Sequence, residues 1–90
     1  MSTKLSPRQS AMLRLSRFDP KDGNGYGVEL RGGADWRTAR ALERRNLGWI
    51  EGGKPQGSEL PGLFFANREG TAITHPDELE RFMARRGYFR

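Results

Sequence analysis

The amino-acid sequence predicts an α+β fold with three helices and a small antiparallel sheet of two or three strands. Three segments carry helix-start patterns, and glycine-rich turns divide the stretch between the second and the third into short pieces typical of strands. The chain of 90 residues suffices for one domain, and its hydrophobic fraction of 34% is rich enough for a folded core. We expect residues 1–5 to form a disordered N-terminal tail and residues 6–90 to form a single domain.

The first helix is predicted from Pro7 to about Phe18. Ser6 offers a hydroxyl cap, Pro7 takes the first helical position, and Gln9 is placed to complete a capping box. The apolar residues that follow at helical spacing are Ala11, Met12, Leu15 and Phe18. The helix should end before the Asp19–Pro20 pair, because a residue that precedes proline avoids the α region.

The second helix is predicted over residues 36–45. The five glycines of residues 20–33 favour loop before it, with residues 26–30 as a short strand or helical turn. Asp35 is expected to cap the helix, because its carboxylate can accept hydrogen bonds from amides of the first turn. Asn46 is expected to end the helix in the left-handed conformation.

Three short segments after the second helix have strand-like composition, namely residues 49–51, 63–67 and 71–74. Residues 52–62 contain four glycines and two prolines, which predicts an exposed loop. Residues 68–70 have the composition of a tight hairpin turn. Together these segments predict an antiparallel sheet of up to three strands.

A third helix is predicted from Pro76 to about Arg86. Thr74 or His75 would begin it, and acidic side chains in its first turn favour the positive end of the helix dipole. The apolar residues expected to form its buried stripe are Leu79, Phe82 and Met83.

The charge balance favours a polyanionic partner. Sixteen Lys and Arg face eleven Asp and Glu, which gives a net charge of +5 and a pI near 10.4. Most of the cations are arginines, whose planar guanidinium suits phosphate and guanine edges. The absence of cysteine excludes disulfides and thiolate zinc sites. With no apolar run long enough to cross a bilayer and a polar N-terminus, we expect a cytoplasmic, nucleoid-associated protein that does not bind membranes.

The second helix carries the strongest functional pattern. Arg37, Arg40 and Arg44 follow the spacing i, i+3, i+7, which places three guanidinium groups on one helix face with the small Ala41 between them. Such a face suits the major groove of duplex DNA, where Arg pairs with guanine edges or with phosphate. An ordinary solvated helix face would show the same spacing.

The order of residues 37–51, RTARALERRNLGWIE, resembles the recognition helix and following strand of winged helix-turn-helix DNA-binding domains. The features shared are a Thr, a Leu four residues later, a basic pair, and a turn residue followed by Leu. The turn residue here is Asn46, where glycine is commoner in the family. The resemblance implies a winged-helix-like fold and a small phage or bacterial transcriptional regulator that binds specific duplex DNA sequences.

By this resemblance, the outward residues of the helix at 36–45 would lie in the major groove and a hairpin tip, the wing, would touch the backbone. Two loops could form the wing, one with Lys54 and the other with Arg68. The DNA-contacting residues so implied are Arg37, Thr38, Arg40, Arg44, Arg45, Lys54 and Arg68. The sequence departs from the family before this helix, since only residues 26–30 and 31–34 stand where a second helix and tight turn are expected.

Two other binding functions use different features of the sequence. A small phage-type inhibitor or interaction module could use the same basic surface to occupy an acidic or nucleic-acid-binding site on a partner protein. Single-stranded nucleic acid could stack on Trp36, Trp49 or Tyr26 if these rings are exposed, although two tryptophans that flank an amphipathic helix favour a core position. A homodimer is a further possibility, with a contact extended by residues 88–89 unless these fold back onto the core.

No catalytic constellation is present in the sequence. The single histidine, His75, stands beside Pro76 at a helix start, where a capping or solvent-facing role is expected. The glycine-rich segment 23–27 lacks the Lys and Ser/Thr of a phosphate-binding loop. We therefore expect a binding protein, not an enzyme, with no cofactor and no metal.

Overall fold

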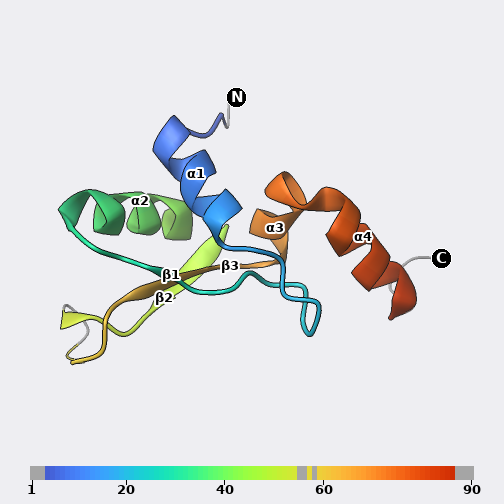
Figure 1. Cartoon of the computed structure of the whole chain (residues 1–90). Coiled ribbons are helices and arrows are strands. Elements are labelled where there is room, and N and C mark those ends of the chain that lie inside the picture. Colours follow the sequence, from blue (N-terminus) through green and yellow to red (C-terminus); the bar gives the residue numbers. More distant parts are fainter. Residues whose placement is uncertain (1–3, 55–56, 58, 87–90) are drawn as a thin grey trace.

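A computed structural model describes residues 4–54, 57 and 59–86 of the chain (Figure 1). The elements in chain order are α1 (Pro7–Leu15), β1 (Val28–Glu29), α2 (Gly33–Arg44), β2 (Gly48–Glu51), β3 (Leu63–Ala66), α3 (Arg68–Thr74) and α4 (Pro76–Arg85). The three strands pair antiparallel in the order β1-β3-β2. The predicted α+β class is confirmed, but the described chain has four helices where the sequence predicted three.

The sheet has one covered face and one open face. Phe64 of the central strand β3 pairs with Val28 of β1 and Ile50 of β2, and both Phe64 and Ile50 are buried. On the other face, the rings of Trp49 and Phe65 stack with centroids 5.2 Å apart and are only half-buried. Figure 1 shows α1, α2 and α3 on the same side of the sheet.

The core lies between the sheet and the helices. Its buried residues are Met12, Leu13, Leu30, Ala39, Leu42, Ile50, Phe64 and Ala66. Leu5, within the predicted tail, packs against this cluster, and the backbone oxygen of Lys4 accepts a hydrogen bond from Arg45. Residues 1–3 lie outside the described part of the chain.

The N-terminus of α1 has the predicted capping box. The Ser6 hydroxyl accepts a hydrogen bond from the Gln9 amide, and the Gln9 side chain accepts one from the Ser6 amide. These two bonds satisfy backbone donors that no helical carbonyl can reach.

The C-terminus of α1 comes earlier than predicted, at Leu15 instead of about Phe18. The next residue, Ser16, is fully buried and links three segments of the chain. Its hydroxyl donates to the Tyr26 carbonyl at 2.8 Å and accepts from the Ala66 amide at 3.0 Å. Ser16 is the C-cap, and the chain leaves the helix at this residue.

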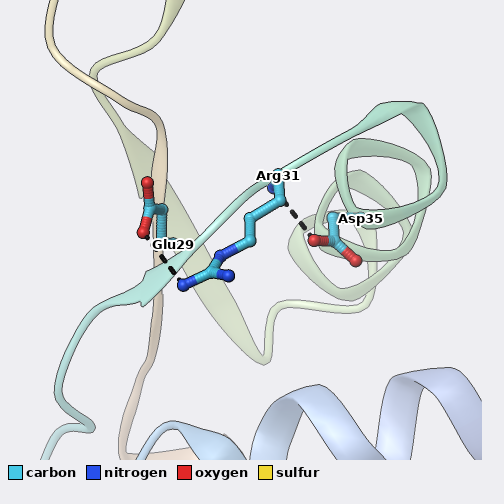
Figure 2. Close-up of polar contacts among 3 residues, drawn as sticks. All are labelled: Glu29, Arg31 and Asp35. Atoms are coloured by element: carbon cyan, nitrogen blue, oxygen red, sulfur yellow. Dashed lines mark hydrogen bonds and ion pairs between the residues drawn. The ribbon is translucent and has the colours of Figure 1, made fainter.

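The start of α2 also differs from the prediction. The helix begins at Gly33, and its N-cap is Gly32, which makes no side-chain capping bond. Asp35 lies inside the first turn, and its Oδ2 accepts a hydrogen bond from the Arg31 amide at 2.9 Å (Figure 2). The carboxylate therefore holds the incoming loop, and the helix extends further toward the N-terminus than the predicted 36–45.

The C-terminus of α2 confirms the role predicted for Asn46, which has a φ of 61°. The Asn46 amide donates to the Glu43 carbonyl, and the Leu47 amide donates to the Leu42 carbonyl. This pair of bonds is the Schellman motif, which requires a residue in the left-handed region.

Substitutions at Asn46 test this cap. We expect Asn46→Val to lower the free energy of unfolding by about 1 kcal/mol or more, because a β-branched side chain is strained at positive φ. Asn46→Gly should be neutral or slightly stabilising, because glycine adopts this conformation without strain. Urea unfolding of both variants measures the difference. A Val variant as stable as the parent would show that the cap contributes nothing.

Residues 68–74, predicted as a hairpin turn followed by a strand, form α3 instead. Asn67 caps the helix, because its side-chain oxygen accepts a hydrogen bond from the Gly70 amide at 2.9 Å. The β-branched Thr71 is fully buried and donates its hydroxyl to the Gly23 carbonyl at 2.8 Å. The third strand of the sheet is thus β1, which precedes α2 in the chain.

The last helix, α4, begins after His75 as predicted and runs to Arg85. Phe82 of the predicted apolar stripe is buried, whereas Leu79 and Met83 are half-buried. Residues 88–89, considered for a dimer contact, lie outside the described part. The longest helix of the described ranges, α2, has 12 residues, and none of the described helices is long and apolar enough to cross a membrane.

Candidate nucleic-acid interface

Helix α2 turns its arginines away from the core. Ala39 and Leu42 are fully buried beneath the helix, whereas the arginine row, which we define as Arg37, Arg40 and Arg44, is exposed along its full length. A helix rotates by about 100° per residue, so these three positions lie within one narrow sector opposite the buried pair. The predicted row therefore exists as a surface.

The three side chains of the arginine row differ in how firmly they are held. The guanidinium carbon of Arg40 lies over the indole of Trp36, 5.4 Å from the ring centroid. Within the described chain, the side chains of Arg37 and Arg44 make no hydrogen bond, ion pair or ring contact. The Arg40 side chain is therefore oriented by a contact within the protein, whereas the Arg37 and Arg44 side chains are free to adjust to a partner.

Two of the predicted contact residues on this helix do not belong to the row. Thr38, expected to face outward, is 8% exposed, and its hydroxyl donates to the Ala34 carbonyl at 2.9 Å. Arg45 is exposed at the C-cap, where its Nη2 donates to the Lys4 carbonyl at 3.2 Å. That bond joins the end of α2 to the segment before α1.

The structure distinguishes between the two loops that were candidates for the wing. Strands β2 and β3 form a hairpin whose loop, residues 52–62, carries the exposed Lys54. Arg68 begins α3 and is not at a hairpin tip; its Nε donates to the Asp22 carbonyl at 2.8 Å, and its guanidinium lies over the Phe82 ring. The prediction of a turn at Arg68 was wrong because Asn67 starts a helix there. Of the two candidate loops, the one with Lys54 joins two paired strands.

An open pocket of about 430 Å³ lies where α2 meets the hairpin. Its lining includes Gly33 and Trp36 from α2, Arg31 before the helix, and Lys54 from the hairpin loop. Figure 1 shows the hairpin and the first turn of α2 at the same end of the molecule, with α4 at the opposite end. No local sequence pattern predicts this junction, because its residues come from three separate segments of the chain.

The segment that joins β1 to α2, residues 30–32, is short and contains no helix. Figure 2 shows Arg31 between Glu29 of β1 and Asp35 of α2. The Arg31 Nη2 lies 3.5 Å from Glu29 Oε1, but the two side chains are 79% and 49% exposed, so this ion pair contributes little stability. The hydrogen bond from the Arg31 amide to the Asp35 carboxylate holds this segment against the first turn of α2.

The aromatic residues considered for base stacking are only partly available. Trp36 is half-buried and packs against the core cluster. Trp49, expected in the core, lies instead on the open sheet face, where its ring stacks on Phe65 and its Nε1 donates to Glu51 at 2.7 Å. Tyr26 is 50% exposed. One face of the Trp49 ring is thus already occupied.

His75 lies at the N-cap of α4, with its Nδ1 2.9 Å from the Thr74 hydroxyl. Within the described ranges, no group of three or more His, Asp or Glu is placed to hold a metal ion.

Comparison of the chain with protein-family models gives no match, and no curated protein or solved structure is significantly similar to it. The case for a function therefore depends on the geometry of the chain itself.

Proposed function

We propose that this protein binds specific sequences of duplex DNA as a small transcriptional regulator of the winged-helix type. In this proposal α2 enters the major groove, and the hairpin loop at residues 52–62 contacts the backbone beside it. The observation that carries the proposal is the exposed arginine row of α2 on the side opposite the buried Ala39 and Leu42. The protein acts by binding and not by catalysis.

The dimensions and chemistry of α2 suit this role. The major groove is about 12 Å wide and admits one α-helix. Four arginines and two acidic residues, Asp35 and Glu43, lie between residues 33 and 45, so this segment has a net charge of +2. Guanidinium groups can pair with guanine edges or phosphates, and Lys54 on the adjacent hairpin can supply a further phosphate contact.

The arrangement of elements also supports the winged-helix type. An antiparallel hairpin follows α2 directly, and β1 completes the sheet on the far side of β3. The structure departs from the family where the sequence does, because β1 runs into α2 without the additional helix that the family has there. The proposal therefore depends on α2 and the hairpin.

Alanine substitutions in the arginine row test the proposal. We expect Arg40→Ala and Arg44→Ala each to weaken specific duplex binding by about 1–3 kcal/mol, because each removes a contact to the DNA. The melting temperature should stay unchanged, because both side chains are exposed. Binding titrations with melting curves measure both effects.

Arg81→Ala is a matched control, since Arg81 is an exposed arginine on α4, at the other end of the molecule (Figure 1). Unchanged affinity in both Arg40 and Arg44 variants, with the fold intact, would remove α2 from the interface.

The open sheet face favours one alternative, a protein partner. Trp49 and Phe65 are half-buried there, and no helix of the described residues covers this face of the sheet (Figure 1). Such a surface suits protein contact. A folded protein that binds no duplex DNA at low salt would favour this alternative.

A further inference from the structure

We propose that Arg40 recognises a guanine in the target duplex and that Trp36 is the residue that positions it. This inference rests on the proposed duplex-binding function and divides the roles within the arginine row. Arg40 supplies sequence specificity, whereas Arg37 and Arg44 supply contacts to phosphate.

Two glycines of the hairpin loop pack against the Trp36 side chain. Gly53 and Gly62, at the two ends of this loop, are both buried against the indole. A Cβ atom on Gly53 would lie 2.5 Å from Cη2 and Cζ2 of Trp36, and one on Gly62 would overlap Cζ2. The loop backbone thus packs directly on the edge of the indole, at a distance that only glycine permits.

Trp36 in turn orients Arg40. The two residues are one helical turn apart, and the Arg40 guanidinium lies within the range of a cation–π contact, 5.4 Å from the ring centroid. Tryptophan is the strongest aromatic partner for this contact, and the flat guanidinium can stack on its ring. The packed indole therefore restricts the positions that the Arg40 side chain can take.

This restriction favours base recognition at Arg40 over the rest of the row. A bidentate bond to O6 and N7 of guanine needs a guanidinium plane in one orientation, and a side chain held near that orientation loses less freedom on binding. Phosphate oxygens accept hydrogen bonds from many directions, so Arg37 and Arg44 can serve there without being held.

The experiment begins with selection of bound duplexes from a random-sequence library by the full chain. Affinities are then measured for the selected duplex and for each single base-pair replacement. We expect one G·C pair whose replacement by A·T weakens binding by about tenfold or more. Arg40→Lys keeps the charge but loses the planar fork, and it should abolish the preference at that pair. Arg44→Lys, the matched control, should keep it.

Two further variants test the positioning role without altering Arg40. Trp36→Leu and Gly62→Ala should both reduce the guanine preference while the slope of affinity against salt stays unchanged, because no cation is lost. Gly32→Ala is the control, since a Cβ atom there meets nothing within 4 Å. Melting curves identify any variant that fails to fold, and Trp36→Phe, which keeps a ring but weakens the cation–π contact, is the milder test of positioning.

The possible outcomes distinguish a failure of this inference from a failure of the proposed duplex-binding function. Selection without an enriched guanine, or a guanine preference that survives Arg40→Lys, overturns the inference while duplex binding stands. A preference lost in Arg40→Lys but fully retained in both Trp36→Leu and Gly62→Ala overturns the positioning role of Trp36. A folded wild-type chain that binds no duplex from the library overturns the proposed function itself.

Discussion

Replacement of Phe64 by alanine is expected to lower the free energy of unfolding by about 3–5 kcal/mol, the cost of removing a large aromatic side chain from a packed core. Phe64 is fully buried on the central strand and lies in the cluster that joins the sheet to α1 and α2. Small domains have a total stability of about 5–15 kcal/mol, so the variant should be close to unfolding at room temperature. Urea unfolding followed by circular dichroism measures this loss.

The neighbouring residue Phe65 is a control on the opposite face of the same strand. It is half-buried and stacks on Trp49, so Phe65→Ala should lose part of its buried area and a ring contact of about 0.5–1.5 kcal/mol. We expect it to cost less than half as much as Phe64→Ala. Equal costs, or a larger cost at Phe65, would show that the helices do not cover the face assigned to them.

The second large effect is expected at Ser16. Ser16→Ala would leave the Ala66 amide and the Tyr26 carbonyl without the hydroxyl that each now contacts. An unsatisfied buried backbone group costs about 1–3 kcal/mol, so we expect a loss of about 2–3 kcal/mol, most of it from the buried Ala66 amide because the bond to Tyr26 is part-buried. The effect far exceeds that of removing an ordinary surface hydroxyl, because Ser16 joins α1, the loop and β3.

Ser10→Ala makes the same change within α1 at a half-buried residue. It should alter the free energy of unfolding by less than about 0.5 kcal/mol, because alanine favours helix. If Ser16→Ala proves as mild as Ser10→Ala, the buried hydroxyl has no structural role.

Local capping chemistry explains what the sequence could predict about the fold. The Ser6–Gln9 box and the left-handed Asn46 depend on residues close together in the chain, and both are present. Ser16 could not be placed this way, because its partners are 10 and 50 residues away. It fell within a helical pattern and gave no local sign of the turn that it makes.

Helix α3 was missed because its sequence favours other structures when taken alone. Arg68-Glu69-Gly70 resembles a turn, and the β-branched residues that follow favour strand. The helix forms because Asn67 caps it and because the Thr71 hydroxyl donates a hydrogen bond to the Gly23 carbonyl, which is distant in the sequence. The Asn67 cap, three residues before Gly70, was the one local signal that could have indicated it.

The candidate site was predictable to the extent that helical spacing determines it. The spacing of Arg37, Arg40 and Arg44 correctly predicted one exposed face. The outward assignment of Thr38 was wrong, although its i, i+4 relation to the apolar Leu42 indicates a shared buried face. The junction of Trp36 with the hairpin depends on backbone proximity between distant segments, which helical spacing cannot predict.

The salt dependence of duplex binding tests the central proposal most directly. Each phosphate neutralised by Arg or Lys adds about 0.9 to the slope of log affinity against log salt. The exposed candidates on the arginine row and the hairpin loop are Arg37, Arg40, Arg44 and Lys54. With roughly three of them on phosphate, affinity should fall more than tenfold between about 50 and 200 mM salt.

Lys54→Ala should reduce that slope by about one unit, whereas Arg81→Ala on α4 should leave it unchanged. We therefore predict a fall in duplex affinity of more than tenfold for the wild-type chain, a smaller salt slope for Lys54→Ala and an unchanged salt slope for Arg81→Ala. A slope near zero, or no duplex binding by the folded protein at about 50 mM salt, would contradict the proposal that α2 and the hairpin bind DNA.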